Sequence, residues 1–174
     1  MRSGLLFILL ILSACDAPPP KEGKSYEDIK EFFEAEARRL SRTNPEINKT
    51  VARNESSETR SVRDINWKTE LSLFAESDIN KPAWQDSYQK VAKGNTVSYR
   101  ATDTTLRTRE IQISKDPAGR ILKINIRNQT RNMLYSSSEQ LLYIPDSVYQ
   151  ISKDQRVVVV GDNHYLLKGL FSKK

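Results

Sequence analysis

The spacing of apolar residues changes after Trp84, from a period near four to a period of two, and this change most constrains the fold. In the second half of the chain apolar residues alternate with polar ones, most clearly over 97–101, 111–113 and 122–126. Such alternation is typical of β-strands that bury one face. The carboxyl-terminal half therefore predicts a β-sheet.

Turn signals separate these strands at intervals too short for crossover helices, which predicts antiparallel neighbours in a meander. The signals are Lys93-Gly94-Asn95, Asp116-Pro117-Ala118-Gly119, Pro145-Asp146, Lys153-Asp154 and Gly161-Asp162-Asn163. The four consecutive valines at 157–160 predict a strand that is central in the sheet or buried on both faces.

Two amphipathic helices are predicted before the sheet. The first opens at Ser25, which with Asp28 resembles a capping box, and ends by Asn44-Pro45 because the residue before a proline leaves the helical region. The second runs from about residue 64 to 77 with its apolar residues on one side. Between the helices, residues 47–62 predict a short edge hairpin.

Neither the helices nor the sheet can hide an apolar side alone, so the helices are expected to cover one face of the sheet. The predicted fold class is α+β, with two N-terminal amphipathic helices packed on a meandering antiparallel sheet of about seven to nine strands. The length is typical of one domain with one core. We expect a single globular domain over 25–171 and a basic tail at 172–174.

The first fourteen residues have the three parts of a secretory signal peptide: a basic start at Arg2, an apolar core at 5–12, and the small residues Ser13 and Ala14. The core is too short for a membrane-spanning helix, which needs about 20 residues. We therefore expect residues 1–14 to be removed.

Leu12, Ser13, Ala14 and Cys15 resemble the lipobox of bacterial lipoproteins, which is a leucine, two small residues and a cysteine. The resemblance implies cleavage between Ala14 and Cys15, a diacylglycerol on the Cys15 thiol, and acylation of the new amino terminus by a chain such as palmitate. Cys15 is the only cysteine, so no internal disulfide is expected. Apart from this covalent lipid, no cofactor is expected.

Residues 15–24 form the predicted linker, in which three consecutive prolines favour an extended spacer of about 3.1 Å per residue. The leader predicts a place in the bacterial cell envelope, in or facing the periplasm, with the chain anchored to a membrane by its lipid. Asp16 resembles the inner-membrane retention signal of enteric bacteria, a rule that other bacteria do not follow. The choice of membrane stays open, with the outer membrane slightly favoured.

Charge is distributed unevenly along the chain. Residues 93–174 carry 14 basic and 7 acidic side chains, whereas residues 15–92 carry 13 and 15. The cationic half could face anionic lipid headgroups. We favour the simpler interpretation of a solvated sheet face that keeps the protein soluble. Nucleic acid is not an expected partner, because the leader directs the domain out of the cytoplasm.

Candidate catalytic groups are scarce. His164 is the only histidine and stands in a predicted hairpin turn, so neither a catalytic base nor a His-rich metal site is predicted. The clustered acids are Glu70, Glu76, Asp78 and Asp86, but Glu70 and Glu76 lie on different faces of a helix. The sequence thus predicts a protein that is not an enzyme and binds no metal.

The segment 78–88 joins the second helix to the sheet and is rich in aromatic and polar residues. Trp84 and Tyr88, with Asp78 and Asn80 beside them, are the candidate partner-binding residues. The alternative, which we favour, is that Trp84 fills the seam between helix and sheet while Asp78 and Asn80 form turn hydrogen bonds.

As a whole the mature domain resembles small lipoproteins of the bacterial envelope, a likeness that implies no particular activity. The leading hypothesis is a membrane-anchored lipoprotein with a non-catalytic binding or structural role, whose partner is another envelope protein or a glycan. One alternative is a carrier of a hydrophobic ligand or lipid in a cleft beneath the helices, similar to half-barrel lipoprotein carriers that lack leading helices. Another is a glycan-acting enzyme with two convergent carboxylates.

Overall fold

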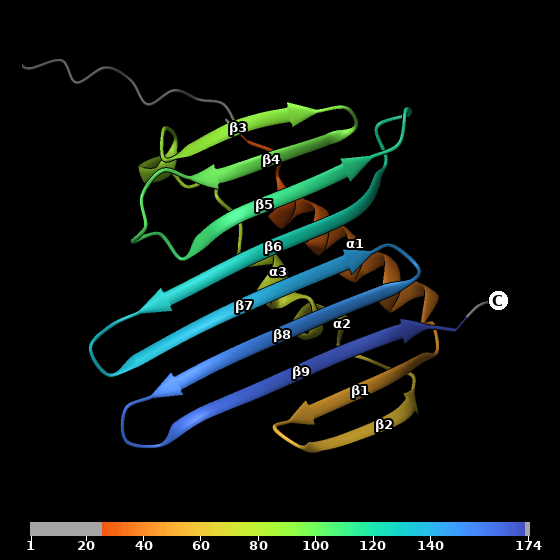
Figure 1. Cartoon of the computed structure of the whole chain (residues 1–174). Helices are drawn as coiled ribbons and strands as arrows, with labels where there is room; N and C mark the ends of the chain where they lie inside the picture. Colours follow the sequence, from red (N-terminus) through yellow and green to blue (C-terminus); the bar gives the residue numbers. More distant parts are fainter. Residues whose placement is uncertain (1–25, 173–174) are drawn as a thin grey trace, which may run out of the picture.

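The computed structural model of the protein describes residues 26–172, in which nine strands form one antiparallel sheet of order β2-β1-β9-β8-β7-β6-β5-β4-β3. The strands are β1 (Ile47–Arg53), β2 (Ser56–Val62), β3 (Tyr88–Lys93), β4 (Thr96–Ala101), β5 (Thr108–Lys115), β6 (Ile121–Arg131), β7 (Tyr135–Ile144), β8 (Val148–Val157) and β9 (Gly161–Phe171). The helices lie behind the sheet in Figure 1, whose viewer looks onto its uncovered face. The predicted α+β class, with N-terminal helices packed on an antiparallel meander, is confirmed.

Strands β3 to β9 follow one another through the sheet in chain order, whereas the predicted edge hairpin, β1 and β2, joins beside the last strand. Ile47 at the start of β1 is opposite Phe171 at the end of β9. A long-range strand pair therefore joins β1, from the amino-terminal part of the domain, to the last strand, β9. No local turn signal in the sequence predicts this pair.

Helix α1 (Ile29–Thr43) begins later than predicted. Its N-cap is Asp28, whose carboxylate accepts the backbone N–H of Glu31 at 2.8 Å. The predicted start was wrong because residues 26–28 are not helical, and Ser25 lies outside the described residues. The predicted end is confirmed: Asn44 has a left-handed φ of 41° and its N–H donates to the Leu40 carbonyl at 2.9 Å.

The second predicted helix is divided in two, α2 (Trp67–Glu70) and α3 (Ser72–Ala75), followed by the 3₁₀ helix η1 (Pro82–Trp84). The break is at Leu71, where φ of −98° and ψ of 6° lie outside the helical well. Leu71 is itself buried, so its apolar side chain belongs to the core although its backbone interrupts the helix.

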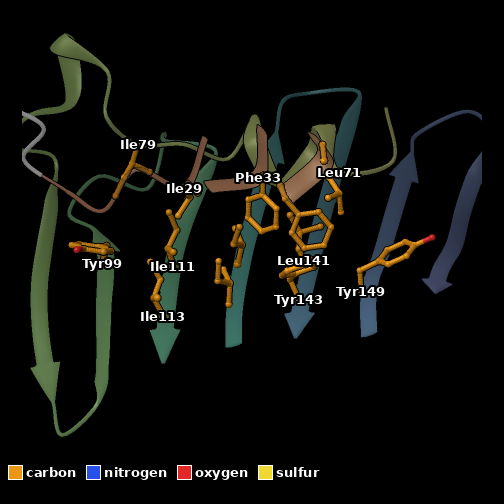
Figure 2. Packing of buried hydrophobic residues seen from close by; sticks show 14 of the residues in the cluster. Ile29, Phe33, Leu71, Ile79, Tyr99, Ile111, Ile113, Leu141, Tyr143 and Tyr149 are labelled. Carbon is orange, nitrogen blue, oxygen red and sulfur yellow. The ribbon is translucent and has the colours of Figure 1, made fainter. Parts of the chain in front are cut away.

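The core fills the space between the helices and the covered face of the sheet (Figure 2). Apolar residues one helical turn apart on α1 meet the inward side chains of the central strands. Phe33 contacts Phe74 of α3 and Tyr143 of β7, with ring centroids 4.9 and 5.2 Å apart. Farther along, the Tyr149 ring lies over Gly169, where an added Cβ would collide with the ring.

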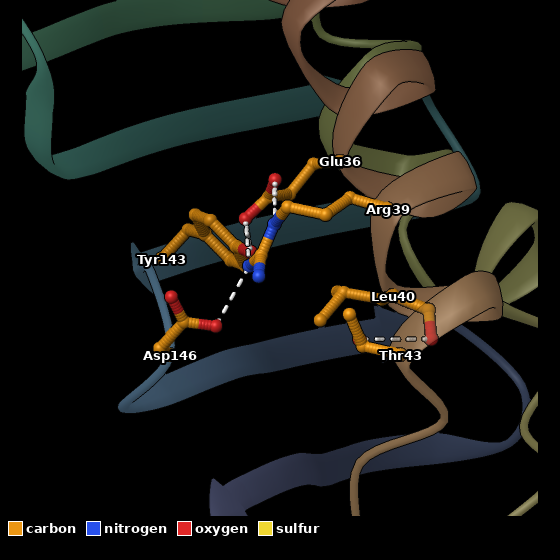
Figure 3. A network of polar contacts seen from close by, with 6 residues as sticks. All are labelled: Glu36, Arg39, Leu40, Thr43, Tyr143 and Asp146. Atoms are coloured by element: carbon orange, nitrogen blue, oxygen red, sulfur yellow. Dashed lines mark hydrogen bonds and ion pairs between the residues drawn. The ribbon is translucent and has the colours of Figure 1, made fainter.

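A polar network fixes α1 to the edge of this core (Figure 3). Arg39 donates to both carboxylate oxygens of Glu36, at 2.7 and 2.8 Å, and to Asp146 at 2.7 Å. The buried Tyr143 hydroxyl donates to Glu36 at 2.6 Å. Burial, together with this hydrogen bond, raises the pKa of Tyr143 well above its usual range.

The prediction that the four valines at 157–160 are buried was wrong. Val157 ends β8, and Val158, Val159 and Val160 form the turn into β9 with most of their surface exposed. High β-propensity reports how well a side chain fits a pleated surface and does not report burial. Here the valines lie beyond the part of the sheet that the helices cover.

Candidate binding surface

The uncovered face of the sheet carries polar side chains over its central strands. Because side chains alternate along a strand, the burial of Ile111, Ile113, Ile124 and Ile126 beneath the helices places the residues between them on the opposite side. We call this uncovered side the open face. Strand pairing aligns its residues in rows, one of which is Gln112, Asn125, Leu142, Gln150 and Lys168.

A shallow hollow of about 390 Å³ lies at the centre of the open face. The side chains that line it include Glu110, Gln112, Asn125, Arg127, Gln140, Leu142 and Gln150. Within the described part of the chain, no other residue hydrogen-bonds the side-chain amides of Asn125, Gln140 and Gln150. Each amide thus offers a donor and an acceptor to whatever covers the hollow.

Glu110 supplies fixed negative charge at one side of the hollow. Its carboxylate accepts from Arg100 at 2.9 Å and from Gln112 at 3.1 Å, and Arg127 lies 3.4 Å away. The hydrogen bond from Arg100 lowers the pKa of Glu110, which keeps the carboxylate ionised. The two arginines outnumber the carboxylate, so this region is cationic.

A second hollow of about 430 Å³ follows on the same face, near the β8–β9 turn. In it His164 Nδ1 is 2.7 Å from Asp154, and Arg156 binds Asp162 through two hydrogen bonds of 2.7 and 2.8 Å. The prediction that His164 lies in a turn was wrong, since it is a residue of β9 opposite Asp154. The strand pairing, which the short-range turn signal did not reveal, brings these charged groups together.

The predicted partner-binding residues gather at the corner between α1 and β3, where most of their polar groups are used internally. The Asn80 amide accepts the Tyr26 N–H and donates to the Glu27 carbonyl, both at 3.1 Å. The Tyr88 hydroxyl donates to the Thr108 carbonyl at 2.9 Å, and burial raises the pKa of Tyr88 to about 12.

The other two residues of that corner are held in the same way. Asp78 accepts the Asn80 N–H at 3.2 Å, and partial burial raises its pKa. Trp84 is half-buried, with the Lys81 ammonium 4.1 Å from the centre of its ring. A groove of about 630 Å³ starts beside this corner and runs between α1 and the short helices.

A buried polar cluster occupies the covered face beyond α3. Glu139 accepts from Arg107 at 2.8 Å, and Lys153 lies 3.4 Å from its other oxygen. The Asn128 amide donates to Ser77 at 2.9 Å. These contacts connect the loop before β5 and the end of α3 to the centre of the sheet, so the cluster has a structural role.

Sequence reasoning missed the amides of the open face. The alternation that exposed them was recognised, but polar residues between isoleucines are what any solvated sheet face carries. What distinguishes them is their position in space: Asn125, Gln140 and Gln150, within 25 positions of one another in the sequence, come together from three neighbouring strands with their amides unengaged. A single sequence contains no signal for that alignment.

In residues 26–172, no three His, Cys, Asp or Glu side chains are grouped to hold a metal ion, and no helix is long and apolar enough to cross a membrane. The predicted lipidation site at Cys15 and the cleavage site after Ala14 lie outside the described residues. The chain is significantly similar to no protein-family model, curated protein or solved structure.

Proposed function

We propose that the protein is a non-catalytic bacterial envelope lipoprotein, anchored by lipid on Cys15, that binds another envelope protein through its open face. The observation that carries this proposal is the central hollow, where the amides of Asn125, Gln140 and Gln150 have no hydrogen-bond partner among residues 26–172. The paired strands fix the spacing of these amides, so a partner has to order only their side chains when it binds.

The composition of the open face favours a protein partner over a glycan. Sugar rings are commonly held by stacking on aromatic side chains, and by register the outward positions of β5 to β9 contain no Phe, Tyr or Trp. Those positions instead offer amides, arginines and a few leucines such as Leu142 and Leu166. Arginines with amides around a partly apolar centre are typical of protein interfaces.

The carrier alternative requires an apolar space between sheet and helices. Over the described residues that space holds the rings of Phe33, Phe74, Trp67, Tyr143 and Tyr149, packed against one another. The groove of about 630 Å³ lies outside this layer, and charged residues such as Lys30, Glu34 and Lys68 are among its lining. No specific observation favours the carrier, which stays an untested alternative.

A photocrosslinking experiment in living cells tests the binding surface. A photoreactive amino acid at Gln140, exposed at the centre of the open face, is expected to form one defined adduct with an envelope protein. The matched control is the same amino acid at Glu34, exposed on α1 on the opposite side of the molecule. Equal adducts at both positions, or none at Gln140, would contradict the proposal.

The lipid anchor is tested separately by the intact mass of the protein purified from membranes. We expect a chain that begins at residue 15 and carries the added mass of acyl groups. The control is the variant Cys15→Ala, which is expected to keep its leader and gain no lipid. A wild-type chain with a free thiol at Cys15 would refute the anchoring part of the proposal.

A further inference from the structure

Two neighbouring hairpin turns form an exposed apolar projection at one end of the sheet. The β6–β7 turn and the β8–β9 turn lie side by side, because the Val158 N–H donates to the Leu134 carbonyl at 3.1 Å. Five apolar residues here have between 65% and 93% of their surface exposed: Met133, Leu134, Val158, Val159 and Val160. We call these five residues the apolar tip.

The fold does not require apolar residues at such turns. At the opposite end of the same meander, the β5–β6 and β7–β8 turns contain Asp116 and Asp146, which pair with Arg120 at 2.6 Å and Arg39 at 2.7 Å. Side chains of that kind are usual in turns, whereas clustered exposed apolar residues mark contact with a partner or a membrane.

We propose that the apolar tip inserts into the surface of the membrane that anchors the chain, an inference that rests on the lipid anchor of the proposed function. Arg156 and Asp162 neutralise each other beside the tip, whereas Arg131 pairs with no acidic side chain among residues 26–172. A positive charge suits anionic headgroups. Tyr135 follows the β6–β7 turn, and amphipathic tyrosines favour the depth where acyl chains meet headgroups.

The position of the anchor permits both contacts with one membrane. Tyr26, the first described residue, packs on Tyr99, which register aligns with Ile126. Met133 is seven residues farther along and two strands across, a separation of about 26 Å at ordinary sheet spacings. Cys15 and Tyr26 are eleven residues apart in the sequence, and a fully extended chain of that length reaches at most about 36 Å. The lipid and the tip can therefore enter the same bilayer.

Vesicle sedimentation tests this proposal without the lipid anchor. The probe is the chain from residue 15 with Cys15→Ser, mixed with vesicles of phosphatidylethanolamine and phosphatidylglycerol in equal parts. We expect this chain to bind the vesicles when its apolar tip is unmodified. The double variant Met133→Asp with Val159→Asp should lower its partition coefficient between water and vesicles by about tenfold or more, because both new side chains would carry charge into the lipid.

The matched control is Val91→Asp with Leu122→Asp, two exposed apolar residues away from the tip that receive the same change in charge. This control is expected to bind vesicles like the unmodified tip. Absence of binding by the unmodified tip, or equal losses in the two variants, would overturn the proposal. Tip-dependent dimerisation without vesicles would also overturn it, since the occupant would then be a second copy of this chain. These outcomes do not depend on the intact-mass measurement of the anchor.

Discussion

On the covered face of the sheet, the Tyr143 hydroxyl donates to Glu36 and the Tyr149 hydroxyl to Glu70, each at 2.6 Å. On the open face, the amides of Asn125 and Gln140 make no such bond within the described structure. A buried polar group without a partner is costly, so these hydrogen bonds of Glu36 and Glu70 offset the cost of burying the two carboxylates and the two tyrosine hydroxyls. The polar side chains of the open face are in contact with solvent and do not bear that cost, so they are available to bind a partner.

The largest loss of stability is expected when an aromatic ring is removed from the covered face. Phe33→Ala would delete a fully buried ring that packs on both Phe74 and Tyr143. We expect the free energy of unfolding to fall by about 3–5 kcal/mol, as measured by urea denaturation. Leu142→Ala on the open face is the matched control, with an expected loss of about 1 kcal/mol. Equal losses would show that the two faces do not differ as described.

An intermediate effect is expected for the tyrosine hydroxyls under the helices. Burial raises the pKa of Tyr143 and of Tyr149, and holds the pKa of Tyr88 at about 12. Between pH 10, where an unfolded tyrosine ionises, and these higher values, the unfolded chain releases protons that the folded chain retains. The contribution of these three hydroxyls to the free energy of unfolding is therefore complete below about pH 10 and is lost as the pH rises further.

Tyr143→Phe isolates one of these hydroxyls. At neutral pH we expect a loss of about 1–2 kcal/mol, because Glu36 keeps its two bonds from Arg39 but loses the one from the hydroxyl. Above pH 10 the decline of unfolding free energy with pH should become shallower by about 1.4 kcal/mol per pH unit. Thermal unfolding followed across this range measures both changes. An unchanged slope would mean that Tyr143 ionises in the folded protein as it does in the unfolded chain.

How far the sequence predicts this molecule depends on the range of the interactions involved. Alternation at Ile111, Ile113, Ile124 and Ile126 indicated strands and their buried side, because period and burial are local properties of a strand. The pairing of β1 with β9 depends on residues more than one hundred positions apart, and no local pattern reveals it.

Two local patterns were misleading for related reasons. The valines after β8 have the composition of a central strand, yet the position of the turn places them outside the core. His164 follows a run of turn-forming residues, yet long-range pairing makes it part of β9. The candidate surface shares this difficulty, because its amides become a group only after β6, β7 and β8 are aligned.

The smallest effect on stability, and the sharpest test of the comparison, is expected on the open face itself. Asn125→Ala combined with Gln140→Ala removes two side chains that make no hydrogen bond or ion pair within the described residues, so the free energy of unfolding should change by less than about 0.5 kcal/mol. Crosslinking from Gln150, beside the altered residues, should nevertheless lose its adduct if these amides bind the partner. A stable variant that still forms the adduct would mean that the amides are ordinary solvated surface, because only binding to a partner would distinguish them from other exposed polar side chains.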